Sequence, residues 1–560
     1  MGHRSLRAVA AAVCGLAVMA AGTATAWASP TDGGGTTADK LTHGEIGLNL
    51  LWIVLGAVLV IFMQAGFALV ETGFCRAKHA AHVVSTNFAI FGLGLVAYFC
   101  VGFAFMFGGY SFPNLFGYDN AIGKALIGSG NHVLLWKGGF FLGGHAYDVS
   151  VLAFFLYMVA FMDTTATIPT GAMAERWRWK AFVQWGLFCG AIYYPLFGAW
   201  TWGGGWLAKL GASAGLGHGY TDFAGSGVVH MMGGVAGLAG AIVLGPRLGR
   251  YGADGKPRTI PGHHIPMAML GTFILLFGWF GFNAGSTLGA TDHRFAVVAA
   301  NTAIAAAFGA VFAMLWVQSR SANKKPDPGM MANGMLAGLV AITAPCAFVQ
   351  PWAAAVIGIV AGVVVVESVW FFEKRGIDDP VGAISVHGVC GAWGVLSVGL
   401  FADGSYGGDW NLTGSSTQNI WGVFYGHDGG GQLVAQVIGV ATIAIVMFGI
   451  ALIFFKLQNA LMKGGIRPSD DVELEGLDIP EMGVLAYPDF LPEEMLGDGA
   501  RRPPVSVSAS SAVTGRLAEV PVTEAPGVEA PVMEPPGGDT PVVETPATGT
   551  PPAGPPPPAP

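Results

Sequence analysis

Charged side chains are scarce in this chain, at 11% of its 560 residues, whereas 53% of the residues are hydrophobic. A soluble domain of this size needs a more polar surface, so the composition predicts a polytopic membrane protein surrounded by lipid. The chain also lacks a global basic patch, which excludes nucleic acid as a partner.

Cysteine is rare as well, with six in the whole chain. Cys14 lies in the N-terminal leader described next, and the other five lie in or beside apolar runs without paired spacing. This pattern excludes a disulfide framework and a thiolate metal site, and it predicts packing roles for the thiols. The five are Cys75, Cys100, Cys189, Cys346 and Cys390.

The N-terminus has the pattern of a secretory signal peptide. Arg4 and Arg7 precede an apolar run, which ends at the small-residue site Ala26-Trp-Ala28. We therefore predict a signal peptide at residues 1–28, cleaved to leave an extracytoplasmic segment at 29–45.

Apolar segments of roughly 20 residues, long enough to cross the hydrocarbon layer, occur eleven times. They centre on residues 46–70, 84–108, 149–172, 181–200, 227–245, 265–284, 295–317, 331–349, 353–372, 384–401 and 432–456.

The first and sixth of these spans share a pattern, because Phe62-x-x-x-Gly66-Phe67 recurs as Phe277-x-x-x-Gly281-Phe282. The recurrence predicts a repeat unit of five spans, and an odd number of spans inverts the second copy. The predicted fold is an all-α polytopic membrane protein of eleven transmembrane helices, over residues 46–458, with two inverted five-helix repeats and one extra helix.

Lysine and arginine concentrate in alternate connections between the spans, for example at Arg76, Lys78 and Arg176. Under the positive-inside rule this bias predicts an outside N-terminus and a cytoplasmic C-terminus in the cell membrane. Residues 459–497 are then a cytoplasmic C-terminal region. The tail at 498–560 is rich in Pro, Val and Glu and is predicted to be disordered.

Two histidines occur in matching contexts. His230 and His387 each follow an aspartate by eight residues, Asp222 and Asp379, and each is followed by glycines at the same offsets. Ionisable side chains inside a membrane are costly, and equivalent positions of inverted repeats meet at the repeat interface. The pair therefore predicts a pathway in which two neutral imidazoles contact each other.

Other interpretations of the histidines remain open. Each ring could be an independent core histidine that bonds to backbone carbonyls of neighbouring helices. A metal site normally recruits a third or fourth ligand, which neither segment supplies, and no nucleophile lies at a recognisable spacing. We expect no metal, no cofactor and no enzymatic activity.

Aromatic and hydroxyl side chains end the sixth span at Gly278-Trp-Phe-Gly-Phe-Asn-Ala-Gly-Ser286, where Phe282 and Ser286 share a helical face. A serine oxygen beside a ring face suits a cation, although close packing of small residues is an alternative. Trp202 ends the fourth span, where an indole is either a ligand wall or a membrane anchor.

Three aspartates need partners in so apolar a chain. Asp163, inside the third span, is expected to face the bundle and to bond to a hydroxyl. The candidates are Thr164, Thr165 and Thr167. Asp222 and Asp379 precede their helices, so N-capping accounts for both, and Asp222 could also stabilise a cation on the outer side.

Several motifs together resemble the ammonium transporter (Amt) family, which is related to the Rhesus glycoproteins, from about residue 48 to 487. The motifs are Ala68-Leu-Val-Glu-Thr-Gly73 with Arg76-Ala-Lys78, Gly171-Ala-Met-Ala-Glu-Arg176, Asp222-Phe-Ala-Gly225, Gly278 to Ser286, and Asp379-Pro380 with His387-Gly-Val-Cys-Gly391.

The resemblance implies a homotrimer with one pore per subunit and assigns roles to single residues. Trp202, Phe161 and Ser286 match the ammonium recruitment site, Phe161 and Phe282 the stacked gate, Trp279 the residue before that gate, His230 and His387 the pore histidines, and Asp222 the aspartate needed for transport. Glu473-x-Glu475-Gly-Leu-Asp-Ile479 with Ala486-Tyr487 implies docking of a trimeric P-II nitrogen regulator at the cytoplasmic face.

The predicted function is ammonium uptake, with methylammonium as an analogue. Ammonium is recruited outside, loses a proton, and passes the histidines as ammonia, with net proton transfer expected. The alternatives are an electroneutral ammonia channel, and an ammonium sensor whose flux is incidental.

Overall fold

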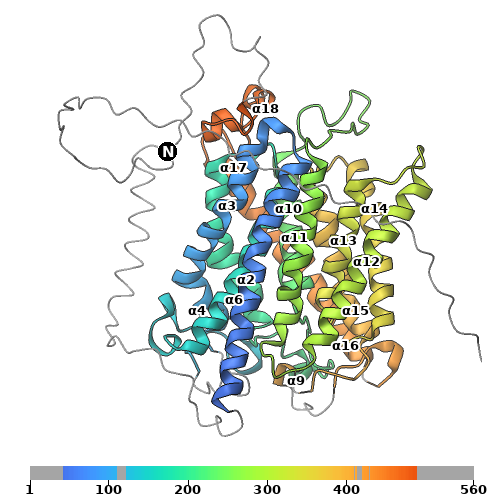
Figure 1. Ribbon diagram of the computed structural model, residues 1–560. Helices are drawn as coiled ribbons and strands as arrows, with labels where there is room; N and C mark the ends of the chain where they lie inside the picture. The colour runs from blue at the N-terminus through green and yellow to red at the C-terminus, as the bar shows by residue number, and fades with distance from the viewer. Residues whose placement is uncertain (1–41, 110–120, 409, 413–418, 428, 489–560) are drawn as a thin grey trace, which may run out of the picture. The chain divides into compact units, whose positions relative to one another are not determined.

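The computed structural model describes residues 42–109, 121–408, 410–412, 419–427 and 429–488. The signal peptide predicted at 1–28 and the tail predicted at 498–560 lie outside these residues. The described part is mostly helical, and Figure 1 shows its long helices running side by side as a bundle.

Nine helical stretches of the described residues are long and apolar enough to cross a membrane, as expected for a multi-pass membrane protein. They are His43–Phe74 (α2), Ala77–Phe107, Val149–Ala172 (α6), Ser226–Leu244, Ile265–Thr287, Phe295–Arg320 (α12), Pro351–Lys374 (α14), Ile384–Phe401 and Gly429–Leu461. The other five stretches contain labelled helices. Ala77–Phe107 contains α3 (Ala80–Ala97) and α4 (Phe103–Phe107), Ser226–Leu244 contains α10 (Met232–Leu244), and Ile265–Thr287 contains α11 (Ile265–Asn283). Ile384–Phe401 contains α15 (Cys390–Phe401), and Gly429–Leu461 contains α16 (Gly429–Thr442) and α17 (Phe448–Leu461).

Two predicted spans correspond to helices outside this set. Residues 179–200 form α7 (Trp179–Phe188), a π-helical turn and α8 (Tyr194–Trp200), and their Trp, Tyr and Lys side chains lower the hydropathy. The segment predicted at 331–349 is helical only in α13 (Pro328–Thr343). Ala344 and then Pro345 follow the last helical residue, and proline cannot continue the helix. The carbonyl oxygens of Thr343 and Ala344 accept hydrogen bonds from the backbone N–H groups of Ala224 and Phe223, which lie in another loop.

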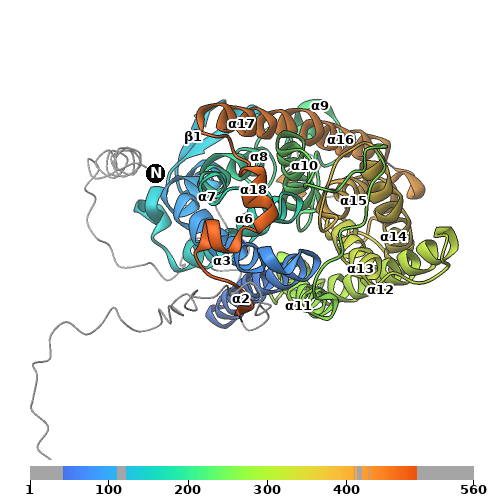
Figure 2. The ribbon, with the colours of Figure 1, turned by 90° about the horizontal axis from the view of Figure 1, so that it is seen from above.

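The helices that carry the recurring phenylalanine–glycine pattern, α2 and α11, lie side by side (Figures 1 and 2). A Cβ atom built on Gly66 would lie 2.7 Å from Cγ of Leu275, and one on Gly281 would lie 2.5 Å from Cβ of Leu59. Both glycines therefore allow the two backbones to approach closely.

One element departs from the all-α prediction. Strands β1 (Lys124–Ile127) and β2 (Leu135–Lys137) pair antiparallel in the connection before α6. The connection after α8 contributes a short helix, α9 (Leu210–Ala214), at the end of the bundle opposite α18 (Asp470–Glu475) (Figure 1).

The C-terminal region packs on the helix ends at the α18 end of the bundle (Figure 2). The carboxylate of Asp478 accepts hydrogen bonds from the backbone N–H groups of Ala81 and His82, at 3.1 and 2.9 Å. The hydroxyl of Tyr487 lies 2.8 Å from Nε2 of His263. These contacts tie the last described residues to the start of α3 and to the segment before α11.

Buried ion pairs join several connections at this same end. Nε of Arg247 lies 2.8 Å from Oδ2 of Asp378, and its Nη1 lies 3.1 Å from Oε1 of Glu175. Arg250 also pairs with Asp378, and Arg176 donates to the backbone oxygen of Asp378 at 2.7 Å. Three connections are therefore held together through one residue, two of them by the carboxylate of Asp378 and the third by its backbone oxygen.

We expect Asp378→Asn to lower the free energy of unfolding by about 3 kcal/mol near neutral pH, since it removes the carboxylate that buried Arg247 and Arg250 share and leaves each with one counter-charge fewer. Burial alone would raise the pKa of Asp378, but Arg176 and Arg247 hold that pKa well below its usual value. Stabilisation by a depressed carboxyl pKa is present above the unfolded-state pKa of about 3.9 and is lost as the pH falls below it. Denaturation of detergent-solubilised protein from pH 7 to 3 tests this, and parallel pH profiles for wild type and variant would contradict it.

Candidate functional site

The two predicted pore histidines meet in the centre of the bundle. His230 lies in the π-helical turn η8 (Ser226–Met231), and His387 lies in a second one, η10 (Ile384–Val389). Their Nδ1 atoms are 3.2 Å apart, and their ring centroids are 5.2 Å apart. Two neutral imidazoles at this distance share one proton between their Nδ1 atoms.

A glycine contact lets the two helices come this close. A Cβ atom on Gly234 would lie 2.2 Å from the backbone nitrogen of Gly388. One on Gly391 would lie 2.5 Å from the backbone oxygen of Ser226. The glycines noted after each histidine in the sequence therefore stand where η8, η10 and their following helices cross.

Asp222 and Asp379 cap the turns that carry the histidines. The carboxylate of Asp222 accepts hydrogen bonds from four backbone N–H groups at 2.7–3.0 Å, those of Gly225, Ser226, Gly227 and Val228. Asp379 accepts from Gly382 and Ile384 at 3.0 and 2.7 Å. Burial raises the pKa of Asp222, and these N–H groups oppose the shift.

Asp222 also reaches the predicted recruitment site, although not through its carboxylate. The indole N–H of Trp202 donates to the backbone oxygen of Asp222 at 2.7 Å. The capped turn thereby fixes the orientation of the indole.

Aromatic rings connect Trp202 with the histidines. Phe161 lies edge-on to Trp202 at 5.8 Å between centroids and is stacked on Phe282 at 4.1 Å. Phe282 lies 5.3 Å from the ring of His230, and Trp279 stacks on the same histidine at 4.9 Å. The side chains of Phe161, Phe282, Trp279 and His230 are all fully buried. The path from Trp202 to the histidines is thus blocked by two stacked phenylalanines.

Ser286 lies beside this stack and is held by a residue that the sequence analysis missed. Its hydroxyl donates to the backbone oxygen of Phe282 at 2.8 Å and lies 3.1 Å from the hydroxyl of Tyr157. Tyr157 in turn lies 4.7 Å from the ring of Phe161. Because the Ser286 proton is directed to a backbone oxygen, the serine oxygen is left to accept a bond from a cation. Tyr157 stands four residues before Phe161 on α6, so the two side chains share a helical face. That spacing was the sequence signal that could have placed Tyr157 at the site.

Asp163 is buried, as expected, but its predicted hydroxyl partner is absent from the described residues. Thr164 and Thr165 bond to backbone oxygens one turn earlier, and Thr167 bonds to Asn87. Oδ1 of Asp163 has no hydrogen-bond partner there. Two of these hydroxyls therefore satisfy the backbone of their own helix, and the third bonds to α3.

Comparison with known proteins places these residues in a family. A profile of the Ammonium Transporter Family matches residues 51–487. Ammonium transporter Amt2 of Archaeoglobus fulgidus is 45% identical over 449 residues, which cover 80% of this chain and 90% of that protein. Ammonium transporter Amt1 of Haloferax mediterranei is 39% identical over 465 residues, covering 80% of each chain.

Solved structures agree with the sequence comparison. One named "Sensor Amt Protein" has a TM-score of 0.66 and 34% identity, covering 78% of this chain and 99% of its own. Candida albicans Mep2 has a TM-score of 0.65 and 26% identity, covering 83% and 97%. The family resemblance drawn from the motifs is confirmed, and this chain belongs to the ammonium transporter family.

Proposed function

We propose that the chain transports ammonium along the series of side chains from Ser286 and Trp202 to His387. The observation that carries this proposal is the contiguous contact of an aromatic and hydroxyl site, a pair of stacked phenylalanines and a pair of bonded histidines. Such an order suits a cation that is recognised outside and loses its charge before it enters an apolar passage.

In the proposed mechanism, Trp202, Phe161 and Ser286 recruit ammonium, and their ring faces and hydroxyl oxygen replace water. Ammonium gives up a proton to water at this site before the stacked Phe161 and Phe282 separate, and ammonia passes Trp279, His230 and His387. Net transfer of the proton makes this transport electrogenic. Neutral imidazoles offer ammonia both a donor and an acceptor, without the cost of a buried charge.

Two other functions remain as alternatives. An electroneutral channel would pass ammonia and leave the proton outside. A sensor would bind ammonium at the same site and signal through its cytoplasmic region, an alternative that gains weight from similarity to the structure named "Sensor Amt Protein".

The same proposal covers architecture and partners. We propose eleven transmembrane helices as two inverted repeats plus one, within 46–458, with the N-terminus outside after removal of residues 1–28. The unit is a homotrimer in the cell membrane. The region at 459–497 receives a P-II regulator, and the tail at 498–560 follows it.

An ammonium pulse applied to proteoliposomes on a solid-supported membrane tests the function. Wild-type protein is expected to give a positive inward current that empty liposomes lack. Ammonia-driven alkalinisation without current would favour the electroneutral channel, and neither signal would favour the sensor.

Trp202→Leu is expected to raise the half-saturating ammonium concentration in that assay about tenfold, because a desolvated cation–π contact contributes about 1–2 kcal/mol. Trp206→Leu is the matched control, since Trp206 packs on Trp200 at 6.0 Å. A half-saturating concentration unchanged in Trp202→Leu would remove this indole from the recruitment site.

A further inference from the structure

A buried carboxyl group lies beyond the histidines and has no role in the mechanism above. Glu71 stands near the end of α2, with 3% of its surface exposed. It lines a small cavity together with His387, Phe67 and Val386. The cavity measures about 20 Å³, which is enough for one water molecule.

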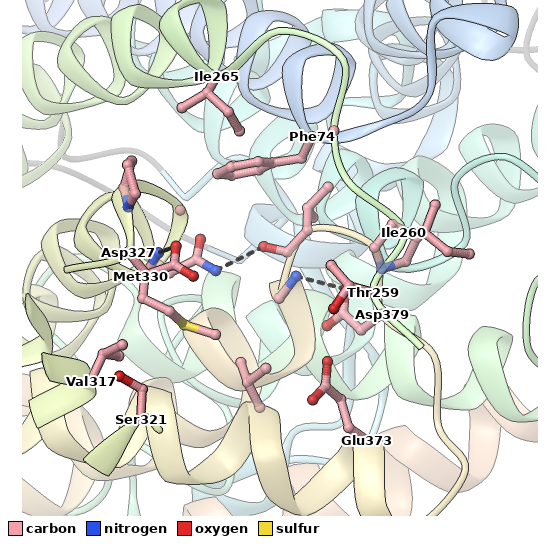
Figure 3. Close-up of a pocket in the computed structure, with 18 of the residues that line it drawn as sticks. Phe74, Thr259, Ile260, Ile265, Val317, Ser321, Asp327, Met330, Glu373 and Asp379 are labelled. Atoms are coloured by element: carbon pink, nitrogen blue, oxygen red, sulfur yellow. Dashed lines mark hydrogen bonds between the residues drawn. The ribbon is translucent and has the colours of Figure 1, made fainter. Parts of the chain in front are cut away.

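This cavity borders a larger one that opens at the α18 end of the bundle. Asn333 and Val381 line both cavities, and the amide of Asn333 donates to the backbone oxygen of Val381 at 3.1 Å. Figure 3 shows the larger cavity, with a volume of about 390 Å³ and with Phe74 and Asp379 in its wall. The Glu71 cavity and this larger cavity, the vestibule, therefore share Asn333 and Val381 in their walls.

The groups that donate hydrogen bonds to the Glu71 carboxyl group are neutral. Nδ2 of Asn87 donates to its Oε2 at 2.7 Å, and the hydroxyl of Thr170 lies 2.9 Å from both carboxyl oxygens. No ion pair of Glu71 occurs within the part of the chain that the structure describes. Among the residues that the structure describes, the titratable groups near Glu71 are His387, Asp379 and Cys75. The helices α3 and α6 place the neutral side chains of Asn87 and Thr170 beside it.

Thr170 can serve both protonation states of the carboxyl group. Its hydroxyl also lies within hydrogen-bond distance of the backbone oxygen of Thr167. When Glu71 is ionised, Thr170 donates to it. When Glu71 is protonated, the carboxyl O–H donates to the oxygen of Thr170, whose own proton turns to Thr167. Neither state leaves a buried donor unpaired.

The histidine pair can deliver a proton to this cavity. Nδ1 of His387 is taken by His230, and none of the described residues bonds to its Nε2. A proton that binds Nε2 of His230 lets the shared Nδ1 proton move to His387, which then releases its Nε2 proton. Both rings are neutral afterwards, and one proton has left on the Glu71 side.

We propose that Glu71 is the acceptor that takes this proton from His387 through one water molecule and passes it to the vestibule. The N–H bond of His387 breaks, an O–H bond of the relaying water is exchanged, and the O–H bond of Glu71 forms, so that one proton moves and no electrons are transferred. This role rests on the proposed transport of ammonium, and it gives the proton a path separate from that of ammonia beyond the histidines.

Glu71→Gln tests the proposal, because glutamine keeps the shape and an acceptor oxygen but binds no proton. The full chain is reconstituted in liposomes, and ammonium-driven current is measured from pH 5 to 8 beside alkalinisation of the vesicle interior. The current of Glu71→Gln is expected to fall at least about tenfold and to lose its pH dependence. Alkalinisation of the vesicle interior, which is small in the wild type because the proton accompanies ammonia, is expected to rise, since ammonia then enters alone. Glu71→Asp is expected to restore part of the current.

Two results would overturn the proposal. One is a wild-type current and pH profile in Glu71→Gln. The other is loss of the current in a folded variant without any rise in alkalinisation, which would mean a packing role. If Glu71→Gln does not fold, Thr170→Val replaces it, and an unchanged current there would also overturn the proposal. Absence of current in the wild type would instead contradict the proposed electrogenic function, independently of Glu71.

Discussion

Replacing Gly234 by alanine is expected to separate the two histidines and to lower the ammonium current about tenfold or more, with a loss of roughly 1–3 kcal/mol in the free energy of unfolding. The added Cβ would lie 2.2 Å from the backbone nitrogen of Gly388. Because this atom belongs to the backbone, it cannot move aside as the end of a flexible side chain could. The two turns would have to part, and the 3.2 Å contact between His230 and His387 would lengthen.

Gly388→Ala is the matched control, because the contact is not symmetric. A Cβ on Gly388 would meet its nearest atom, the backbone carbon of Gly234, at 3.5 Å, which is ordinary van der Waals distance. This variant is expected to keep most of the current and of the thermal stability. Equal behaviour of the two alanine variants, measured by current and by melting in detergent, would mean that this crossing does not set the histidine geometry.

Asp222→Ala is expected to abolish measurable current. It leaves four buried backbone N–H groups without their acceptor, and each such group costs about 1–3 kcal/mol. The turn that carries His230 would loosen, and the backbone oxygen that orients Trp202 would move with it. The loss should therefore appear both in the maximal current and in the half-saturating ammonium concentration.

The equivalent cap at Asp379 provides the comparison. Asp379→Ala removes two such hydrogen bonds. The indole of Trp202 is hydrogen-bonded to the backbone of Asp222 and not to that of Asp379. It is expected to lower the maximal current while leaving the half-saturating concentration near the wild-type value. If Asp379→Ala raised that concentration as strongly as Asp222→Ala does, the inference that the Asp222 cap orients Trp202 would be wrong.

The long apolar runs made most of the helices predictable, since a segment that must satisfy its own backbone in lipid has few alternatives to a helix. The prediction was wrong in detail at 331–349, where the helix ends at Thr343. Hydropathy could not show this, because the carbonyl oxygens released there are satisfied by the distant loop at Phe223 and Ala224. The hairpin of β1 and β2 was missed for a similar reason, as short strands in a connection leave no periodic signal.

The candidate site was likewise predictable only in part. Repetition of the aspartate–histidine spacing pointed to His230 and His387, and the structure brings them into contact. Tyr157 and Glu71 were overlooked because their partners, Ser286 and Thr170, are remote in the chain. Asp163 shows the converse, since proximity in sequence suggested threonine partners that are bonded elsewhere.

The π-helical turns that carry His230 and His387 have a consequence for insertions and deletions. A π turn holds one residue more than an α turn, and such turns are thought of as single-residue additions to a helix. Loss of one residue from η8 or η10 would restore an ordinary helix and rotate the histidine by about 100° relative to the residues after it. The mutual alignment of the imidazoles is therefore set by residue count, and a length change of one in either turn would undo it with every side chain of the site still present.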